Sequence, residues 1–263
     1  SCHSPESKRL VDAMHNRTTH KDRQLKPVAG ITALIAGALL LLVNLYGVFV
    51  TSLRAPAVEG YRDFAGVVTL TYRAAAQQLR EIPDDDRMNL VTRATRVIHE
   101  GIAHIDPDDV DRIGLGPLHM TVPLWENYIL HVLAYLKPDT YRDYEFCDHR
   151  RSLARGVGRC GQQSLALVDF LSKRGLPTGF VNLGGHTVAM ADVGDNHWVL
   201  LDPDYGGVVP FDIKAAERDP AAVIPYYWND QVVRRNAWRL YGPEENEVKY
   251  GGPSARWGRA CLI

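Results

Sequence analysis

The sequence predicts an α+β protein with one membrane-spanning helix near its N-terminus. An uncharged apolar run occupies residues 28–50, helical spacing of apolar residues dominates from there to about residue 175, and short alternating strands with glycine turns follow. We therefore expect four segments: a cytoplasmic tail (1–27), a transmembrane helix (28–50), the helical part of an extracytoplasmic domain (51–150), and the core of that domain with its tail (151–263). The helical part is expected to pack on an antiparallel sheet.

The composition is that of a folded protein and argues against a nucleic-acid partner. Of the 263 residues, 23% are charged and 46% are hydrophobic, and the formal net charge at pH 7 is -1. This length suffices for one large domain or two small ones. A chain with almost no net charge lacks the excess of basic residues that binds a phosphate backbone. We expect neither a nucleic-acid partner nor a cofactor.

The apolar run from Val28 to Val50 has no charged residue and would form a helix about 34 Å long, enough to cross about 30 Å of hydrocarbon. A buried core helix or a cleaved signal peptide is the alternative. The run is longer than the apolar part of a signal peptide, and no convincing small-residue cleavage site follows Val50. We therefore expect a single-pass membrane protein.

Basic residues predict the orientation of this helix. Only Arg54 and Arg62 lie in the first fifteen residues after it, whereas six basic residues precede it: Lys8, Arg9, Arg17, Lys21, Arg23 and Lys26. Because basic segments stay in the cytoplasm, we expect the N-terminus there. The protein would then lie in the inner (cytoplasmic) membrane, with its C-terminal domain in the periplasm or otherwise outside the cytoplasm.

The cysteines agree with an extracytoplasmic domain. Cys2 falls on the cytoplasmic side, which leaves Cys147, Cys160 and Cys261 in a compartment where disulfides persist. A Cys147–Cys261 bridge would leave Cys160 free. Two unpaired thiols at those positions are the alternative, because the sequence does not determine connectivity.

Three helices are expected before the core. Residues 61–81 are rich in alanine and free of proline, and a second helix begins after the aspartates at 84–86 and runs to about residue 103. Carboxylates at 84–86 complement the dipole at that helix start. The third helix covers residues 124–136 and stops at Pro138.

Several polar residues in this part are expected to be structural. His99 and His104 are five residues apart and so point about 140° apart on a helix, unlike the pair of a zinc protease. No Cys-x-x-Cys or His-x-x-x-His pair adds ligands to Cys160 and His186, so we expect no metal site. The basic run from His149 to Arg155 is expected to be a solvated face.

Cys160 is expected in the first turn of a helix. Gly156 and Gly158 permit a tight turn before it, and apolar residues recur with helical spacing until Gly175 and Pro177 end the helix. At such a position the helix dipole and unpaired backbone N–H groups stabilise a thiolate and can donate to an oxyanion. Glycine, arginine and glutamine neighbours argue against a purely apolar, structural cysteine.

A strand over residues 178–183 and a hairpin follow this helix. Residues 186–193 and 198–202 alternate as strands, and a loop centred on Gly194 would join them. That loop predicts the pairs Asp192–Asn196, Met190–Trp198, Val188–Leu200 and His186–Asp202. A carboxylate would then lie beside the His186 imidazole, while His197, in the turn, would be out of phase with that face.

Less structure is expected after the hairpin. Residues 208–211 suit an edge strand and residues 212–218 a short helix. The aromatic segment 221–228, with Tyr226, Tyr227 and Trp228, is expected to pack on the domain rather than line a groove. After Tyr241 no regular element is expected.

These motifs together resemble the transglutaminase-like superfamily of papain-type cysteine enzymes. Its pattern is a Gly-x-Cys helix start, an L-x-x-x-G-[IL]-P helix end, a strand led by histidine, and a W-x-x-L-D-P strand. The matching residues are Gly158, Cys160, Leu171, Gly175, Leu176, Pro177, His186, Trp198, Leu201, Asp202 and Pro203. Two features depart from the pattern: Thr187-Val188 replaces a small residue and tryptophan, and the interval from the cysteine to the histidine is short.

The resemblance implies a membrane-anchored cysteine hydrolase or acyltransferase with Cys160 as nucleophile, His186 as general base and acid, and Asp202 as its orienting carboxylate. Gln162 is a candidate second oxyanion donor and Trp198 a candidate substrate contact. The substrate would be an amide or ester of an envelope peptide, protein or modified polysaccharide. The alternative is a catalytically idle domain that binds a partner in a membrane assembly.

Overall fold

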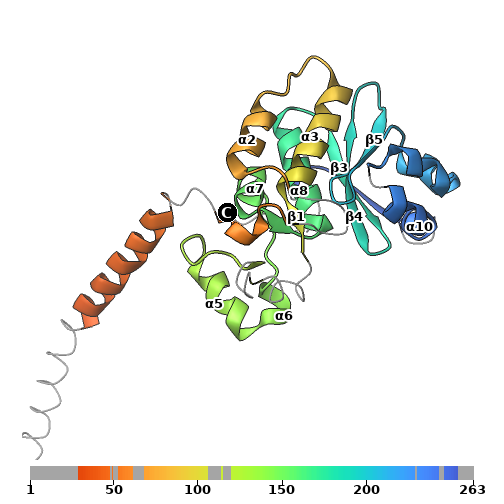
Figure 1. Cartoon of the computed structure of the whole chain (residues 1–263). Coiled ribbons are helices and arrows are strands. Elements are labelled where there is room, and N and C mark those ends of the chain that lie inside the picture. The colour runs from red at the N-terminus through yellow and green to blue at the C-terminus, as the bar shows by residue number, and fades with distance from the viewer. Residues whose placement is uncertain are drawn as a thin grey trace, which may run out of the picture. The chain divides into compact units, whose positions relative to one another are not determined.

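The computed structural model describes residues 29–47, 49, 53–61, 68–105, 114, 120–228, 230–242 and 246–253. The chain divides into two compact units. One comprises Ser1–Val50 with Pro123–Tyr128, and the other Thr51–Val122 with Ile129–Ile263. Figure 1 shows the second unit as helices packed on a sheet, which confirms the predicted α+β class.

The first unit contains the expected apolar helix. Ala29–Gly47 forms 19 helical residues, none of them buried over its apolar window, and its length and composition suit a membrane crossing. At its C-terminal end the ring of Tyr46 meets that of Trp125 edge-on, with 5.7 Å between centroids. The first and last expected residues of the span and the basic residues before it lie outside the described residues, so the orientation stays a prediction.

The second unit is built on a five-stranded antiparallel sheet in the order β6-β5-β4-β3-β7. Its strands are β3 (Thr178–Leu183), β4 (His186–Asp192), β5 (Trp198–Asp202), β6 (Gly207–Val209) and β7 (Asn246–Tyr250). A separate two-stranded parallel pair joins β1 (Ala103–His104) to β2 (Val157–Gly158). Both strands of the hairpin lie inside the sheet, and all of their residues except Asp192 and Trp198 are buried.

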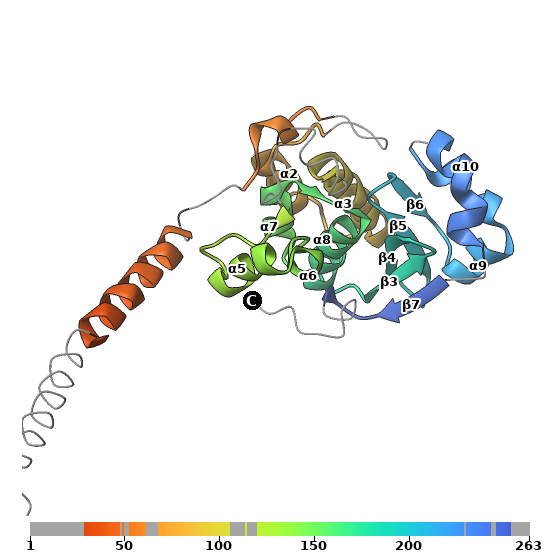
Figure 2. The same ribbon diagram turned by 90° about the horizontal axis from the view of Figure 1, so that it is seen from below.

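Helices cover both faces of this sheet (Figure 2). Besides Ala29–Gly47, the helices of the described residues are α2 (Tyr72–Arg80), α3 (Arg87–Gly101), α5 (Tyr128–Leu136), α6 (Pro138–Tyr141), α7 (His149–Arg155), α8 (Cys160–Lys173), α9 (Ile213–Arg218) and α10 (Asp230–Tyr241), with 3-10 turns η1 (Pro56–Val58) and η3 (Pro220–Tyr226). Phe180, Ala189 and Leu201 pack against α3 and α8, whereas Val181 and Val188 belong to the core with α9 and α10. Alternate residues of each strand therefore face two different cores.

Local signals fix where the helices begin and end. Asp86 caps α3, since its carboxylate accepts hydrogen bonds from the backbone N–H groups of Met88 and Asn89. The first predicted helix begins later than expected, at Tyr72, because Thr69 and Leu70 are not helical and donate their N–H groups to the carbonyl of Glu100. Residues 62–67 of that prediction lie outside the described residues. The third helix likewise begins at residue 128, since residues 124–126 form a turn.

The part after the hairpin is more ordered than predicted. The prediction that no regular element follows Tyr241 is wrong, because β7 pairs with β3 and forms the sheet edge. The helix α10 was also missed. Its exposed arginines gave the segment a basic character, yet Val233, Ala237 and Leu240 are buried at helical spacing against the sheet core.

The hairpin register also differs from the prediction. Met190 pairs with Leu200 and not with Trp198. The loop is centred one residue later than expected, on Asp195, and is closed by a hydrogen bond from the Val193 N–H to the His197 carbonyl. Asp195 and Asn196 both adopt positive φ, 55° and 59°, which aspartate and asparagine tolerate better than most residues.

The register error leaves the predicted contact in place. Each residue of β4 pairs two positions further along β5 than expected, and a shift of two keeps every side chain on its face. His186 and Asp202 therefore still share a face, although they are not a directly opposed pair. A shift of one residue would have separated them.

The cap of α3 provides a test of this fold. Replacing Asp86 with alanine removes the acceptor for two backbone N–H groups, and we expect the free energy of unfolding to fall by about 1 kcal/mol. The matched control is Asp85→Ala, an exposed neighbour, with an expected change within about 0.5 kcal/mol. Urea titration followed by near-ultraviolet circular dichroism measures both, and equal losses would contradict the assigned cap.

Candidate active site

Cys160 is the first residue of α8 and a free thiol. Gly156, at φ 71°, ends α7, and the chain then turns so tightly that a Cβ on Gly158 would lie 2.5 Å from that of Gln162. Glycine is therefore required at 158. The thiol is half-buried at the positive end of a 14-residue helix, where free N–H groups remain.

The other described cysteine does not compete with this thiol. Cys147 is disulfide-bonded, and its partner lies outside the described residues. Pairing with Cys261 stays a prediction. A free Cys160 beside a bridged Cys147 leaves one reactive thiol in the described part of the domain.

His186 connects the thiol to a buried carboxylate. His186 is 5% exposed at the start of β4, and its Nε2 lies 2.9 Å from Oδ2 of Asp202. The Cys160 sulfur lies within 4.8 Å of a ring nitrogen of His186, so the thiol, the imidazole and the Asp202 carboxylate form one cluster. The geometry is that of a base held by a carboxylate and turned toward a nucleophile.

Asp202 is held from several sides. Its Oδ2 accepts a second hydrogen bond from the Tyr227 hydroxyl at 3.0 Å, and Oδ1 accepts from the backbone N–H groups of Asp204 and Tyr205 at 3.1 Å each. The hydroxyls of Tyr227 and Tyr241 bond each other. We predicted only that Tyr227 packs, and its hydrogen bond to Asp202 has no signal in the sequence pattern.

These contacts set the protonation of the imidazole. Burial alone would lower the pKa of His186, but the charge and hydrogen bond of Asp202, the hydrogen bond of Cys160 and the charge of Asp204 raise that pKa well above its ordinary value. The His186 interaction in turn keeps the pKa of Asp202 below its usual value despite burial. Both pKa shifts favour the pair in which the imidazole is protonated and the carboxyl group is ionised.

Asp204 is the site residue that sequence analysis missed. Its Oδ2 lies 3.7 Å from Nδ1 of His186, on the side of the ring away from Asp202. Its Oδ1 contacts Nδ1 of His104 at 2.7 Å and accepts from Nε2 of Gln163 at 2.9 Å. The only sequence signal was its place in the Asp-Pro-Asp run, two residues after Asp202.

Gln162 has a structural role instead of the predicted oxyanion contact. Its amide group is fully buried and accepts from the Phe146 N–H and Arg155, while its Nε2 donates to the Phe146 carbonyl and the Ser152 hydroxyl. Both Nε2 hydrogens have partners, so none remains for a substrate oxygen. The prediction of a solvated face over 149–155 is also wrong for Arg155, which is 1% exposed.

Trp198 lies at the opposite end of β5 from Asp202 and donates its Nε1–H to Asn196. Its ring contacts Tyr250 of β7. It therefore does not line the space around Cys160. His197, the rival base, is equally remote, with its Nε2 2.9 Å from the carbonyl of Pro210.

A cleft of about 340 Å³ opens beside the thiol. Cys160, Gly161, His186 and Thr187 form one side, and Met120 and two acidic residues line another. One of these acids, Asp143, is paired with Arg159, which also lines the cleft. A substrate carbonyl can therefore reach the thiol and the free end of α8 together.

Among the residues that the structure describes, two groups of side chains have the geometry of metal ligands. In one, the ligand atoms of Cys160, His186 and Asp204 lie within 4.8 Å of one another. Our expectation of no metal site did not consider Asp204, which supplies a third donor. In the other group, of Asp148, His149 and Asp169, the ammonium of Lys173 already bonds both carboxylates at 2.9 Å, so the cation position is filled.

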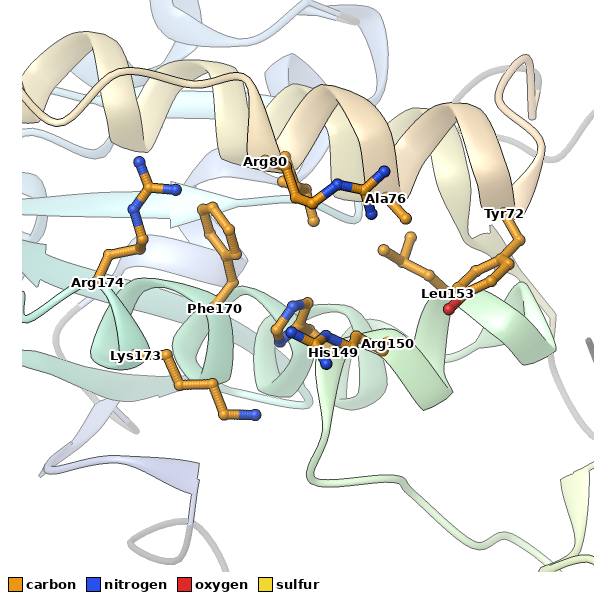
Figure 3. A pocket seen from close by; sticks show the side chains of 10 residues that line it. Tyr72, Ala76, Arg80, His149, Arg150, Leu153, Phe170, Lys173 and Arg174 are labelled. Atoms are coloured by element: carbon orange, nitrogen blue, oxygen red, sulfur yellow. The ribbon is translucent and has the colours of Figure 1, made fainter. Parts of the chain in front are cut away.

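That second group borders a pocket of about 420 Å³ between α2, α7 and α8 (Figure 3). Its histidine is bonded to a carboxylate, with 2.6 Å between Nδ1 of His149 and Oδ2 of Asp169. However, the described residues that line it include neither a serine nor a cysteine. Without a nucleophile this His–Asp pair is an ion-pair network at the far end of α8 from Cys160.

No protein-family model and no curated protein sequence matches the chain. The site therefore rests on its own geometry. What that geometry establishes is a cluster of Cys160, His186 and two buried aspartates in an α+β fold, with a second His–Asp pair elsewhere that has no thiol.

The raised pKa of His186 predicts how stability depends on pH. An unfolded histidine titrates near 6.5, so the folded state holds the extra proton above that pH, and the stabilisation is complete below about pH 6.5 and lost as pH rises through the folded pKa. We expect the urea midpoint to fall from pH 7 upward in the wild type. His186→Gln should remove that slope, and the exposed control His197→Gln should keep it. An unchanged slope in His186→Gln would contradict the assignment.

Proposed function

We propose that the protein is a membrane-anchored cysteine hydrolase or acyltransferase that forms an acyl-enzyme at Cys160. The observation that carries this proposal is the cluster of the Cys160 thiol with His186, whose Nε2 lies 2.9 Å from Oδ2 of Asp202, at the edge of an open cleft. The motif resemblance to transglutaminase-like enzymes supports the same roles. Asp202 would orient the ring, and the backbone N–H of Cys160 would face the substrate oxygen.

In the proposed reaction His186 holds the proton of the thiol while the Cys160 sulfur attacks the carbonyl carbon of an amide or ester. When the tetrahedral intermediate collapses, His186 gives its proton to the leaving nitrogen or oxygen, and a thioester remains on Cys160. Water or an acceptor amine then attacks the thioester, loses its proton to His186, and releases the acyl group from the sulfur. Hydrolysis and transfer differ only in this second nucleophile.

The apolar helix Ala29–Gly47 places the reaction at a membrane in this proposal. The domain would face the periplasm or the outside of the cytoplasmic membrane, where a disulfide at Cys147 is stable. Envelope peptides, proteins or modified polysaccharides are the substrates available there. An idle domain that binds a membrane partner would need the cleft but not the ionised histidine.

Labelling tests the nucleophile. A thiol-reactive acylating probe should label Cys160 in the full-length wild type, and Cys160→Ala should lose that label while any label on Cys2 remains. Asp202→Asn should slow labelling by about 10²- to 10⁴-fold, because the ring loses its orienting charge. Asp195→Asn, an exposed position in the hairpin loop, is the matched control and should label like the wild type. An unlabelled wild type with an intact fold would reject the proposal.

A zinc centre is a second candidate, favoured by the donor set of Cys160, His186 and Asp204. Three protein ligands with a fourth position open is the arrangement of catalytic zinc, and Asp202 would hold the ligating imidazole from behind.

Metal content distinguishes the two candidates. For a thiol enzyme we expect no stoichiometric zinc in the purified full-length chain and probe labelling that persists after chelation. One bound zinc, lost in Asp204→Asn but kept in the control Asp148→Asn, together with labelling that begins only after chelation, would favour the zinc centre instead.

A further inference from the structure

The helix α5 presents an apolar face to solvent. Ile129, Val132 and Leu136 are 59%, 51% and 74% exposed and lie on one side of the helix, with Tyr128 and Tyr135 beside them at 40% and 58%. Five large apolar or aromatic side chains on nine residues form a patch of the kind that marks an interaction site.

The inner side of α5 is attached to the domain. Nδ1 of His131 lies 2.8 Å from the carbonyl of Val122, and Ala134 is buried. The exposed side is therefore a stable feature of the helix and is not left open by fraying. Lys137, which is exposed, follows the last turn.

The segment just before α5 contacts the end of the apolar N-terminal helix. In the first unit, Trp125 packs on the end of that helix so closely that a Cβ on Gly47 would lie 2.4 Å from the tryptophan ring. Three residues later α5 begins. Tyr46 and Trp125 meet edge-on at this end, which is where aromatic residues gather at a membrane surface.

The tether to the second unit is also short. Five residues separate Gly47 from Leu53, so the two lie at most about 20 Å apart when this segment is fully extended. The domain is fixed from Leu53 onward, since the Leu53 N–H donates to the carbonyl of Ala154 and Arg54 donates to that of Leu70. If Ala29–Gly47 spans a bilayer, the domain cannot move far from its surface.

We propose that α5 lies in the headgroup region of a phospholipid bilayer, with Ile129, Val132 and Leu136 toward the acyl chains. The occupant of this face is lipid, because the short tether and the Trp125 contact hold the start of α5 where the membrane helix ends. Tyr128 and Tyr135 provide rings with polar tips at this depth, and the Lys137 ammonium meets lipid phosphates.

The position of α5 at the bilayer indicates a substrate class for the cleft, an inference that rests on the proposed function. The segment 120–144, which contains α5 and α6, leaves and re-enters the domain at neighbouring points, since the N–H of Tyr144 donates to the carbonyl of Met120 at 2.8 Å. Met120, Asp143 and Glu145, at the two ends of this segment, also line the cleft beside Cys160. If α5 lies in the lipid, the ends of segment 120–144 hold this side of the cleft at the bilayer. The enzyme would then act on amides or esters of membrane-anchored molecules.

Photocrosslinking tests the docking independently of catalysis. The full-length protein carries p-benzoylphenylalanine in place of Val132 or, as a control, of Trp238, which is 69% exposed on α10. In phospholipid vesicles, mass spectrometry should find lipid adducts at position 132 at several times the yield at position 238. Equal yields, or adducts at 132 with a second copy or another protein, would overturn the proposal.

Two thiol probes test the substrate class. The rate of Cys160 alkylation is measured in vesicles with N-ethylmaleimide and with a maleimide-headgroup phospholipid. Val132→Glu should slow the lipid probe about tenfold and leave N-ethylmaleimide unchanged, while Trp238→Glu should alter neither. If N-ethylmaleimide alkylates Cys160 and the lipid probe never does, the membrane-facing cleft is rejected and the proposed nucleophile is not. If Cys160 resists both, the proposed nucleophile fails instead.

Discussion

The structure depends on the buried carboxylate of Asp202. A carboxylate removed from water is costly unless donors surround it, and here the donors are the His186 ring, the Tyr227 hydroxyl and two backbone N–H groups. They come from β4, from the segment after η3, and from the turn after β5. Satisfying one carboxylate therefore requires the hairpin, the turn and the C-terminal region to assemble together.

The two-sided sheet explains how this carboxylate and the thiol come to meet. One face packs on α3 and α8, which places Cys160 over the start of β4, and the other face packs on α9 and α10, which brings the tyrosines to Asp202 from the opposite side. A sheet with one solvated face would leave Asp202 exposed to water. Its influence on the imidazole would then be weaker, because water screens charge.

Glycine and proline residues at the ends of helices and strands made part of the fold predictable. The helix α8 begins two residues after Gly158, and the strand β3 ends directly before Gly184. Both elements match the predicted ranges to within two residues. The predicted hairpin register was wrong because the loop is centred on Asp195, where Asp195 and Asn196 adopt positive φ, and the sequence pattern did not indicate this. The error is two residues, an even number, so His186 and Asp202 still share a face and the predicted contact between them remains.

Contacts between distant polar residues were beyond the sequence. His104 meets Asp204 across 100 positions, and Gln162 is buried against α7, because tertiary packing and not periodicity selects these partners. The helix α10 was missed for a different reason, because its exposed arginines lie between the residues of a buried apolar stripe. Pattern analysis locates elements well and identifies the partners of buried polar groups poorly.

The Tyr227–Tyr241 pair has a consequence for biosynthesis. Ribosomes make Cys160 and His186 well before Tyr241, so during synthesis the carboxylate lacks part of its support until α10 has docked. Asp202 therefore gains its complete set of hydrogen bonds only after the chain has been made through Tyr241 and α10 has packed on the sheet.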